Sequence, residues 1–76
     1  MTELLTQIIK AIVDNPDEVQ INEVQGERAV VLEIKVAADD VGKVIGREGR
    51  IINSLRHIIK AAAGKSNKRV NIELIS

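Results

Sequence analysis

The chain has 76 residues, with 11 basic and 11 acidic side chains and a net charge of zero, and 45% of its residues are hydrophobic. This length and composition predict one small domain over residues 1–76 with a packed aliphatic core. The chain has no cysteine and one histidine, which excludes disulfides and metal sites built from thiolates or several histidines. The absence of aromatic residues excludes recognition of bases by aromatic stacking. No apolar run approaches the roughly 20 residues of a membrane span.

The N-terminal half predicts a helix followed by two strands. Apolar residues recur at helical spacing through residues 3–14, with Thr2 as a candidate cap and Asn15-Pro16 as the end of the helix. Alternating apolar residues predict a short strand over 19–24 and a clearer strand over 28–36, close enough to pair as a hairpin. The residues expected on the inner face of the second strand are Val30, Leu32, Ile34 and Val36.

The C-terminal half predicts two helices and a last strand. A short helix within residues 37–45 is expected to be capped by Asp39 or Asp40, and a long amphipathic helix over 48–63 follows it. With a final strand over 69–75 the order is αββααβ, which predicts an α+β domain whose helices pack on one face of a three-stranded sheet. The long helix is expected to pack a stripe formed by Ile51, Ile52, Leu55, Ile58, Ile59 and Ala62.

Charge is divided unevenly along the chain. Residues 1–40 hold three basic and nine acidic residues, a net charge of −6, whereas residues 41–76 hold eight basic and two acidic residues, a net charge of +6. This asymmetry predicts that the C-terminal half faces an anion. Chance clustering of surface charges is the alternative. Within that half the basic segment Lys65–Arg69 either contacts phosphates or only keeps a loop soluble.

Between the two predicted helices lies the loop Gly46-Arg47-Glu48-Gly49. Two glycines allow a tight turn and a close approach of the backbone to a ligand. The following helix directs its unpaired N–H groups and positive dipole end to the same place, and Arg47, Arg50 and Lys43 add positive charge. These features suit a phosphodiester backbone, although the tetrapeptide alone is also compatible with a plain turn between helices.

In its context this loop resembles a known signature. Val44-Ile45-Gly46-x-x-Gly49-x-x-Ile52-x-x-Leu55 is similar to the K-homology (KH) signature, whose GXXG loop clamps about four nucleotides of single-stranded RNA. The whole chain, with Asp40-x-Gly42 before the loop, resembles type II KH domains and the KhpA family of small bacterial RNA-binding proteins. The resemblance implies a backbone clamp and an aliphatic groove for bases. By this resemblance Gly46, Arg47, Glu48 and Gly49 form the clamp. The other residues expected to bind RNA are Val44, Ile45 and Ile52 in the groove and the basic residues Lys43 and Arg50.

The function expected from these patterns is non-enzymatic binding of single-stranded RNA, as an RNA chaperone or post-transcriptional regulator in the cytoplasm. No catalytic residue, metal or cofactor is expected, and no P-loop string or signal peptide is present. The alternative is a protein-interaction module of KH fold that acts mainly by dimerisation or docking. The resemblance implies a homodimer or a heterodimer with another KH-containing protein, and Val31 and Ile75 on the outer sheet face are candidates for an association surface.

Overall fold

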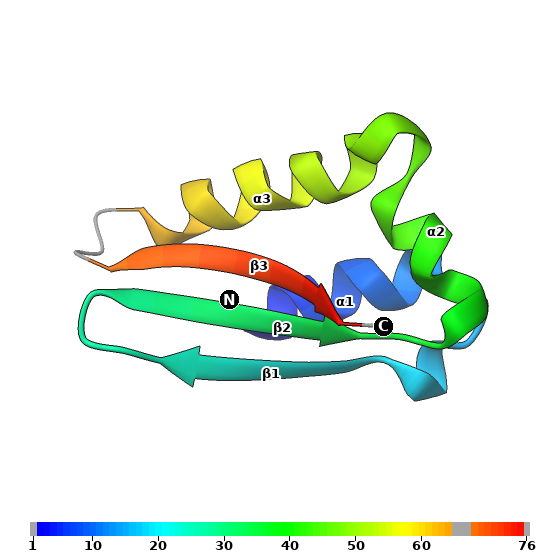
Figure 1. Ribbon diagram of the computed structural model, residues 1–76, viewed down its shortest axis with the longest axis horizontal. Helices are drawn as coiled ribbons and strands as arrows, with labels where there is room; N and C mark the ends of the chain where they lie inside the picture. Colours follow the sequence, from blue (N-terminus) through cyan, green and yellow to red (C-terminus); the bar gives the residue numbers. More distant parts are fainter. Residues whose placement is uncertain (1, 65–67, 76) are drawn as a thin grey trace.

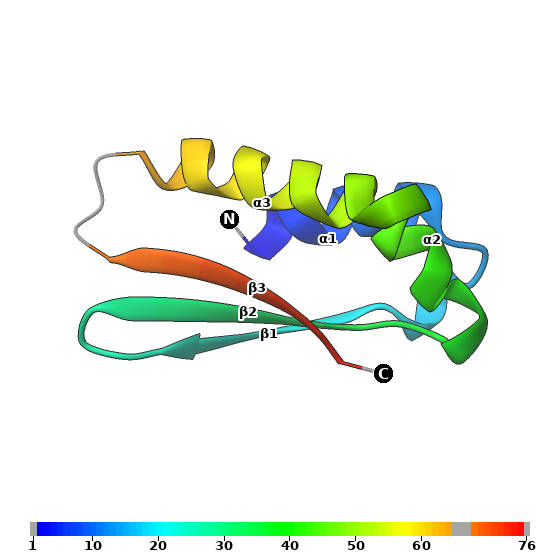
Figure 2. The same ribbon diagram turned by 45° about the horizontal axis from the view of Figure 1, so that its top comes forward.

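The elements of the protein follow the order predicted from its sequence, and the computed structural model describes residues 2–64 and 68–75 (Figure 1). All helices cover one face of the sheet, which confirms the α+β class with a single layer of helices (Figure 2). Single turns of 3₁₀ helix lie at Pro16–Glu18, Ala38–Asp40 and Arg47–Gly49. The main elements are α1 (Thr2–Ile12), β1 (Gln20–Gln25), β2 (Ala29–Lys35), α2 (Val41–Ile45), α3 (Arg50–Ala63) and β3 (Arg69–Ile75).

The sheet is mixed, with the strand order β1-β2-β3. Strands β1 and β2 form the predicted antiparallel hairpin, in which Ile21 faces Ile34. Strand β3 pairs in parallel with β2, with Leu32 opposite Ile72. Parallel neighbours need a crossover connection, and α2 and α3 supply it. The crossover therefore contains the Gly46–Gly49 loop, between α2 and α3.

The core fills the space between the inner sheet face and the helices. The expected alternation in β2 is confirmed, because Leu32 and Ile34 are fully buried. Burial of each such side chain contributes roughly 1.5–3 kcal/mol, so the apolar layer between sheet and helices is the main source of stability. The other buried apolar residues are Leu5, Ile9, Val13, Val19, Val30, Val36, Val44, Ile52, Leu55, Ile59, Val70 and Ile72.

Helix α3 differs from its prediction at its edges. Ile52, Leu55 and Ile59 are buried as expected, but Ile51 and Ile58 are 37% and 43% exposed and do not belong to the core. The predicted apolar stripe is wider than the strip of helix surface that contacts the sheet. The helix also begins at Arg50 rather than at residue 48, since Glu48 and Gly49 have positive φ angles.

Helix α1 is also shifted from its prediction. It ends at Ile12, three residues before Asn15. Thr2 is its first helical residue rather than a cap preceding it, and the Thr2 carbonyl accepts a hydrogen bond of 2.7 Å from the Thr6 hydroxyl. The predicted ends of the strands are correct to within one residue.

Candidate nucleic-acid interface

The Gly46–Gly49 loop projects from the end of the molecule where α2 meets α3 (Figure 1). Gly46 has φ 75° and ψ 176°, and Gly49 has φ 75° and ψ 14°. A Cβ atom at position 46 would lie 2.5 Å from Cγ1 of Ile51, so no side chain fits there. The glycine thus lets the loop fold back against the first turn of α3, with its tip in solvent.

Two backbone amides at the loop tip are left without a backbone acceptor. The N–H of Gly49 donates to the carbonyl of Gly46 at 3.2 Å, and the N–H of Arg50 donates to the carbonyl of Arg47. Among the described residues, no backbone carbonyl accepts a hydrogen bond from the amides of Arg47 and Glu48. Together with the positive end of α3, these amides form a concentrated donor site that suits an anion.

Glu48 adopts an unusual backbone conformation at this tip. Its φ of 57° and ψ of 26° lie in the left-handed region, and it is the one residue other than glycine with positive φ in the described chain. For an L-residue this conformation costs about 1–2 kcal/mol. Its carboxylate is exposed and lies 3.6 Å from the guanidinium of Arg50. The loop therefore presents one acidic side chain between two basic ones.

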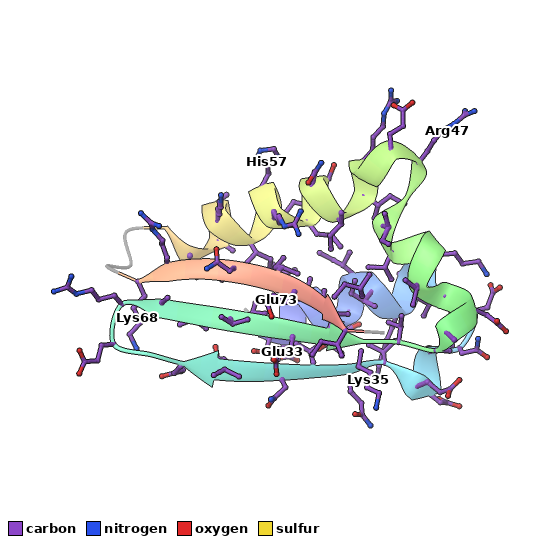
Figure 3. The ribbon with its side chains drawn as sticks, viewed as in Figure 1. Glu33, Lys35, Arg47, His57, Lys68 and Glu73 are labelled. Carbon is purple, nitrogen blue, oxygen red and sulfur yellow. The ribbon has the colours of Figure 1, made fainter. Side chains whose placement is uncertain are left out.

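The three basic residues expected at the site have different surroundings. Arg47 points away from the body of the molecule at the loop tip (Figure 3), and Arg50 is 78% exposed. Lys43 donates a hydrogen bond to the carboxylate of Asp14, and its Nζ lies 3.6 Å from Asp40 Oδ1. The hydrogen bond to Asp14 and the charges of both carboxylates outweigh desolvation and raise the pKa of Lys43. Its charge is therefore largely compensated within the protein.

Asp40 is fully buried and joins α1 to α2. Its carboxylate accepts hydrogen bonds from the Asp14 N–H at 3.1 Å, the Asn15 N–H at 2.9 Å and the Asn15 side-chain amide at 3.1 Å. Burial raises the pKa of Asp40. These hydrogen bonds and the charge of Lys43 together lower it by more, so the pKa of Asp40 lies below its ordinary value. The expected capping of α2 is wrong, because the side chain makes no cap hydrogen bond.

The aliphatic residues expected in a groove are only partly accessible. Val44 is fully buried and Ile52 is 7% exposed, so both belong to the core. Ile45, which precedes the loop, is 38% exposed. Ile51, which helical periodicity places in the core, is exposed to a similar extent beside Gly46. The exposed aliphatic surface at the loop therefore comes from Ile45 and Ile51.

Other kinds of site find little support in the described residues. His57 projects from the outer side of α3, away from the sheet (Figure 3). No described group of three or more histidine or carboxylate side chains is placed to hold a metal ion. Among the described helices, none has the length and apolar character needed to cross a membrane. The loop between α2 and α3 is thus the best-defined candidate site.

The chain is similar over nearly its whole length to a group of small proteins. The family model described as KhpA/KhpB, KH domain, matches residues 2–74. RNA-binding protein KhpA of Clostridium acetobutylicum is 57% identical over 75 residues, which cover 99% of this chain and 100% of that protein. The proteins of the same name from Caldanaerobacter subterraneus subsp. tengcongensis and Clostridium perfringens are 52% and 51% identical, with the same coverage. No solved structure gave a significant match.

Proposed function

This chain belongs to the KhpA/KhpB family of KH domains, and from that membership we propose that it binds single-stranded RNA through the Gly46–Gly49 loop. The observation that carries the proposal is the exposed loop tip, where the free amides of Arg47 and Glu48 lie between two basic side chains. The protein acts without catalysing a reaction, as an RNA chaperone or post-transcriptional regulator. The names of its relatives support RNA binding.

In this proposal the loop holds the phosphates of about four nucleotides. The amides of Arg47 and Glu48 donate hydrogen bonds to phosphate oxygens, and the guanidinium groups of Arg47 and Arg50 add charge-assisted bonds. The contact between Gly46 and Ile51 fixes the loop before RNA arrives, which reduces the entropy lost on binding. Lys43 has a minor role, because Asp14 and Asp40 already compensate its charge.

The bases are held without aromatic stacking, since the chain has no aromatic residue. Ile45 and Ile51 offer aliphatic surface next to the loop. Strand β3 pairs only with β2 among the described strands, so its other edge presents unpaired N–H and C=O groups on the side of α3 (Figures 1 and 2). Hydrogen bonds from this edge to base edges, combined with the aliphatic contacts, supply the remaining affinity.

We also infer that the protein pairs with a second copy of itself or with another KH-containing protein. One domain that grips about four nucleotides binds weakly, and a second RNA site in the same assembly raises affinity through effective concentration. Val24 and Ile75 are 47% and 39% exposed on the outer sheet face, where Val24 lies opposite Val31. These residues support an association surface on the side of the sheet remote from the helices.

A double substitution in the loop tests the RNA clamp. Arg47→Asp with Glu48→Asp keeps both glycines and should change the free energy of unfolding by no more than about 0.5 kcal/mol, the usual range for surface changes. Binding of a fluorescent single-stranded RNA should collapse, because the new charge repels phosphates. Lys10→Glu, at an exposed position of α1, changes the net charge by the same amount and should leave binding nearly unchanged.

The same pair of variants separates RNA binding from a docking function. If RNA binding is lost while the partner or dimer is retained, the loop is an RNA clamp. A folded double variant that binds RNA as tightly as the parent protein would show that the clamp lies elsewhere. Retained cellular function in a variant without RNA binding would favour the alternative of a protein-interaction module.

A further inference from the structure

A second group of basic side chains lies at the end of α3 remote from the Gly46–Gly49 loop. Where the end of α3 meets the start of β3, the surface opens into a cavity of about 300 Å³. Lys60, Lys68 and Arg69 supply its charged lining and are called the distal basic cluster below, and Asn71 adds a side-chain amide. No acidic residue is among the described residues that line it. Lys68 and Arg47 lie at opposite ends of the molecule (Figure 3).

Backbone hydrogen bonds fix the two sides of this cavity. The N–H of Gly64 donates to the carbonyls of Lys60 and Ala61 at 3.3 and 3.1 Å, which ends α3 at this point. The N–H of Arg69 donates to the carbonyl of Arg28 at 2.9 Å, which fixes the start of β3 against β2. The basic side chains of the cluster thus extend from backbone positions that are set by the fold.

Three basic side chains at this end, Lys60, Arg69 and Arg28, form no ion pair among the described residues. Arg28 and Arg69 line an adjacent depression, in which Glu27 is the one acidic lining residue. The end of α3 contributes about half a negative charge, which is too little to balance the charges of Lys60 and Arg69. A concave surface of one sign attracts the opposite charge.

A polar flank of α3 connects the loop to the cluster. A Cβ atom on Gly49 would lie 3.7 Å from the side-chain nitrogen of Asn53, so this flank begins at the loop. Asn53 Oδ1 accepts a hydrogen bond of 3.0 Å from Arg56, and Lys60 follows one turn later. At 3.6 residues per turn these three residues lie within the same quadrant of the helix. The flank carries amide and basic groups and no acidic one.

Resting on the proposed RNA-binding function, we propose that the distal basic cluster is a second phosphate-binding site for the same RNA strand. The strand leaves the Gly46–Gly49 loop, follows the flank of Asn53 and Arg56, and places a later phosphate among Lys60, Lys68 and Arg69. The amide of Asn71 hydrogen-bonds to the strand at that point. The domain therefore contacts more nucleotides than the loop alone holds.

The length of α3 sets the length of RNA that reaches both sites. Lys60 lies about 15 Å along α3 from its first residue, and Arg69 lies beyond the end of the helix, whose 14 residues span about 21 Å at a rise of 1.5 Å per residue. A strand stacked at about 3.4 Å per nucleotide covers the length of the helix in roughly six steps, and a more extended strand needs fewer. An oligomer of about five nucleotides held by the loop falls short of the cluster when stacked, whereas one of about twelve reaches it.

The test compares two RNA lengths on a variant that lacks two of the cations. Lys60→Gln with Arg69→Gln should weaken binding of a labelled uridine oligomer of about twelve nucleotides roughly tenfold, and the slope of log K against log salt should become shallower by roughly 1.4. Binding of the oligomer of about five nucleotides should change less than about twofold, because charges about 15 Å or more away are screened in 0.1 M salt. Lys10→Gln with Lys35→Gln, at two exposed positions elsewhere, should affect neither oligomer.

Equal losses for both oligomers, or no loss for the longer one, would overturn the proposal. Loss of binding to an acidic partner protein, with RNA binding unchanged, would assign the cluster to that partner instead. Failure of the parent protein to bind either oligomer would refute the proposed function itself. A measurement on the unsubstituted protein is independent of variant folding: the amide NMR signals of Gly64 and Asn71 should shift with the longer oligomer and stay in place with the shorter one.

Discussion

Glu33 and Glu73 occupy partner positions in the parallel ladder of β2 and β3, on the face of the sheet that no helix covers (Figure 3). The side-chain amide of Asn22 donates a hydrogen bond of 3.1 Å to Glu33, whereas Glu73 is exposed. Like charges directly opposite one another destabilise a sheet. This face thus carries a repulsive pair at its centre, and it is less suited to RNA than the helical side.

Removing one charge of this pair should stabilise the protein. Glu73→Gln keeps the size of the side chain and should raise the free energy of unfolding by roughly 0.2–1 kcal/mol, the range for cross-strand pairs. Urea denaturation measures the change. Glu18→Gln, at an exposed position outside the sheet, removes the same charge and should alter stability far less. Equal effects of the two substitutions would show that net charge, rather than the pair, is responsible.

The two loop glycines should respond differently to alanine. Gly46→Ala places a methyl group against Ile51, at a backbone conformation (φ 75°, ψ 176°) that essentially only glycine adopts, and should destabilise the protein by more than the roughly 1–2 kcal/mol that the left-handed conformation costs at Gly49. At Gly49 the new methyl group has room, and only the conformational cost remains. Urea denaturation of both variants checks the order. A Gly49→Ala variant as unstable as Gly46→Ala would contradict the contact with Ile51.

Substitutions at Glu48 should separate conformation from charge. Glu48→Gln removes the charge and should raise RNA affinity several-fold with little change in stability, because an acid beside the phosphate site repels the ligand. Glu48→Asn removes the same charge and also suits the left-handed backbone, so it should add up to about 1 kcal/mol of stability. RNA titration and urea denaturation of both variants give the two quantities. Unchanged affinity in both would place the phosphates away from this residue.

Stability should fall in acid because of Asp40. A carboxyl group whose pKa is lowered in the folded protein stabilises it above the unfolded pKa, about 3.9 for aspartate, and this contribution is lost as pH falls through the folded pKa. The free energy of unfolding should therefore decrease below about pH 4. In Asp40→Asn stability should be lower at neutral pH and this part of the pH dependence should be absent. Asp39→Asn, at the exposed neighbouring position, removes the same charge outside this hydrogen-bond network and serves as the control.

The sequence was sufficient to predict the features that depend on near neighbours. Alternation in β2 and the position of the Gly46–Gly49 loop follow from residues within a few positions of each other, and both are found in the structure. Periodicity also located the apolar side of α3. It did not indicate how much of that side the sheet covers, so Ile51 and Ile58 were assigned to the core although they are exposed.

The features that the sequence did not predict depend on distant partners. Asp40 was expected to cap a helix, and its actual donors lie 25 and 26 residues earlier in the chain. Lys43 donates a hydrogen bond to Asp14, which lies 29 residues earlier in the chain. No local pattern marks such pairs, because they form only when α1 and α2 pack together. The sequence allows two roles for the basic segment 65–69, phosphate contact or solubility of a loop, and residues 65–67 lie outside the described part of the chain.

The parallel pairing of β2 with β3 has a consequence for how the protein folds and how proteolysis inactivates it. Ala29 pairs with Arg69, so this ladder closes a loop of 40 residues, whereas the β1–β2 hairpin forms locally. Closing the longer loop costs more chain entropy, and a two-stranded hairpin alone is marginal in water. We therefore expect the folded state to depend on pairing of the last strand. Proteolytic removal of β3 would unfold the whole domain rather than lower its stability slightly.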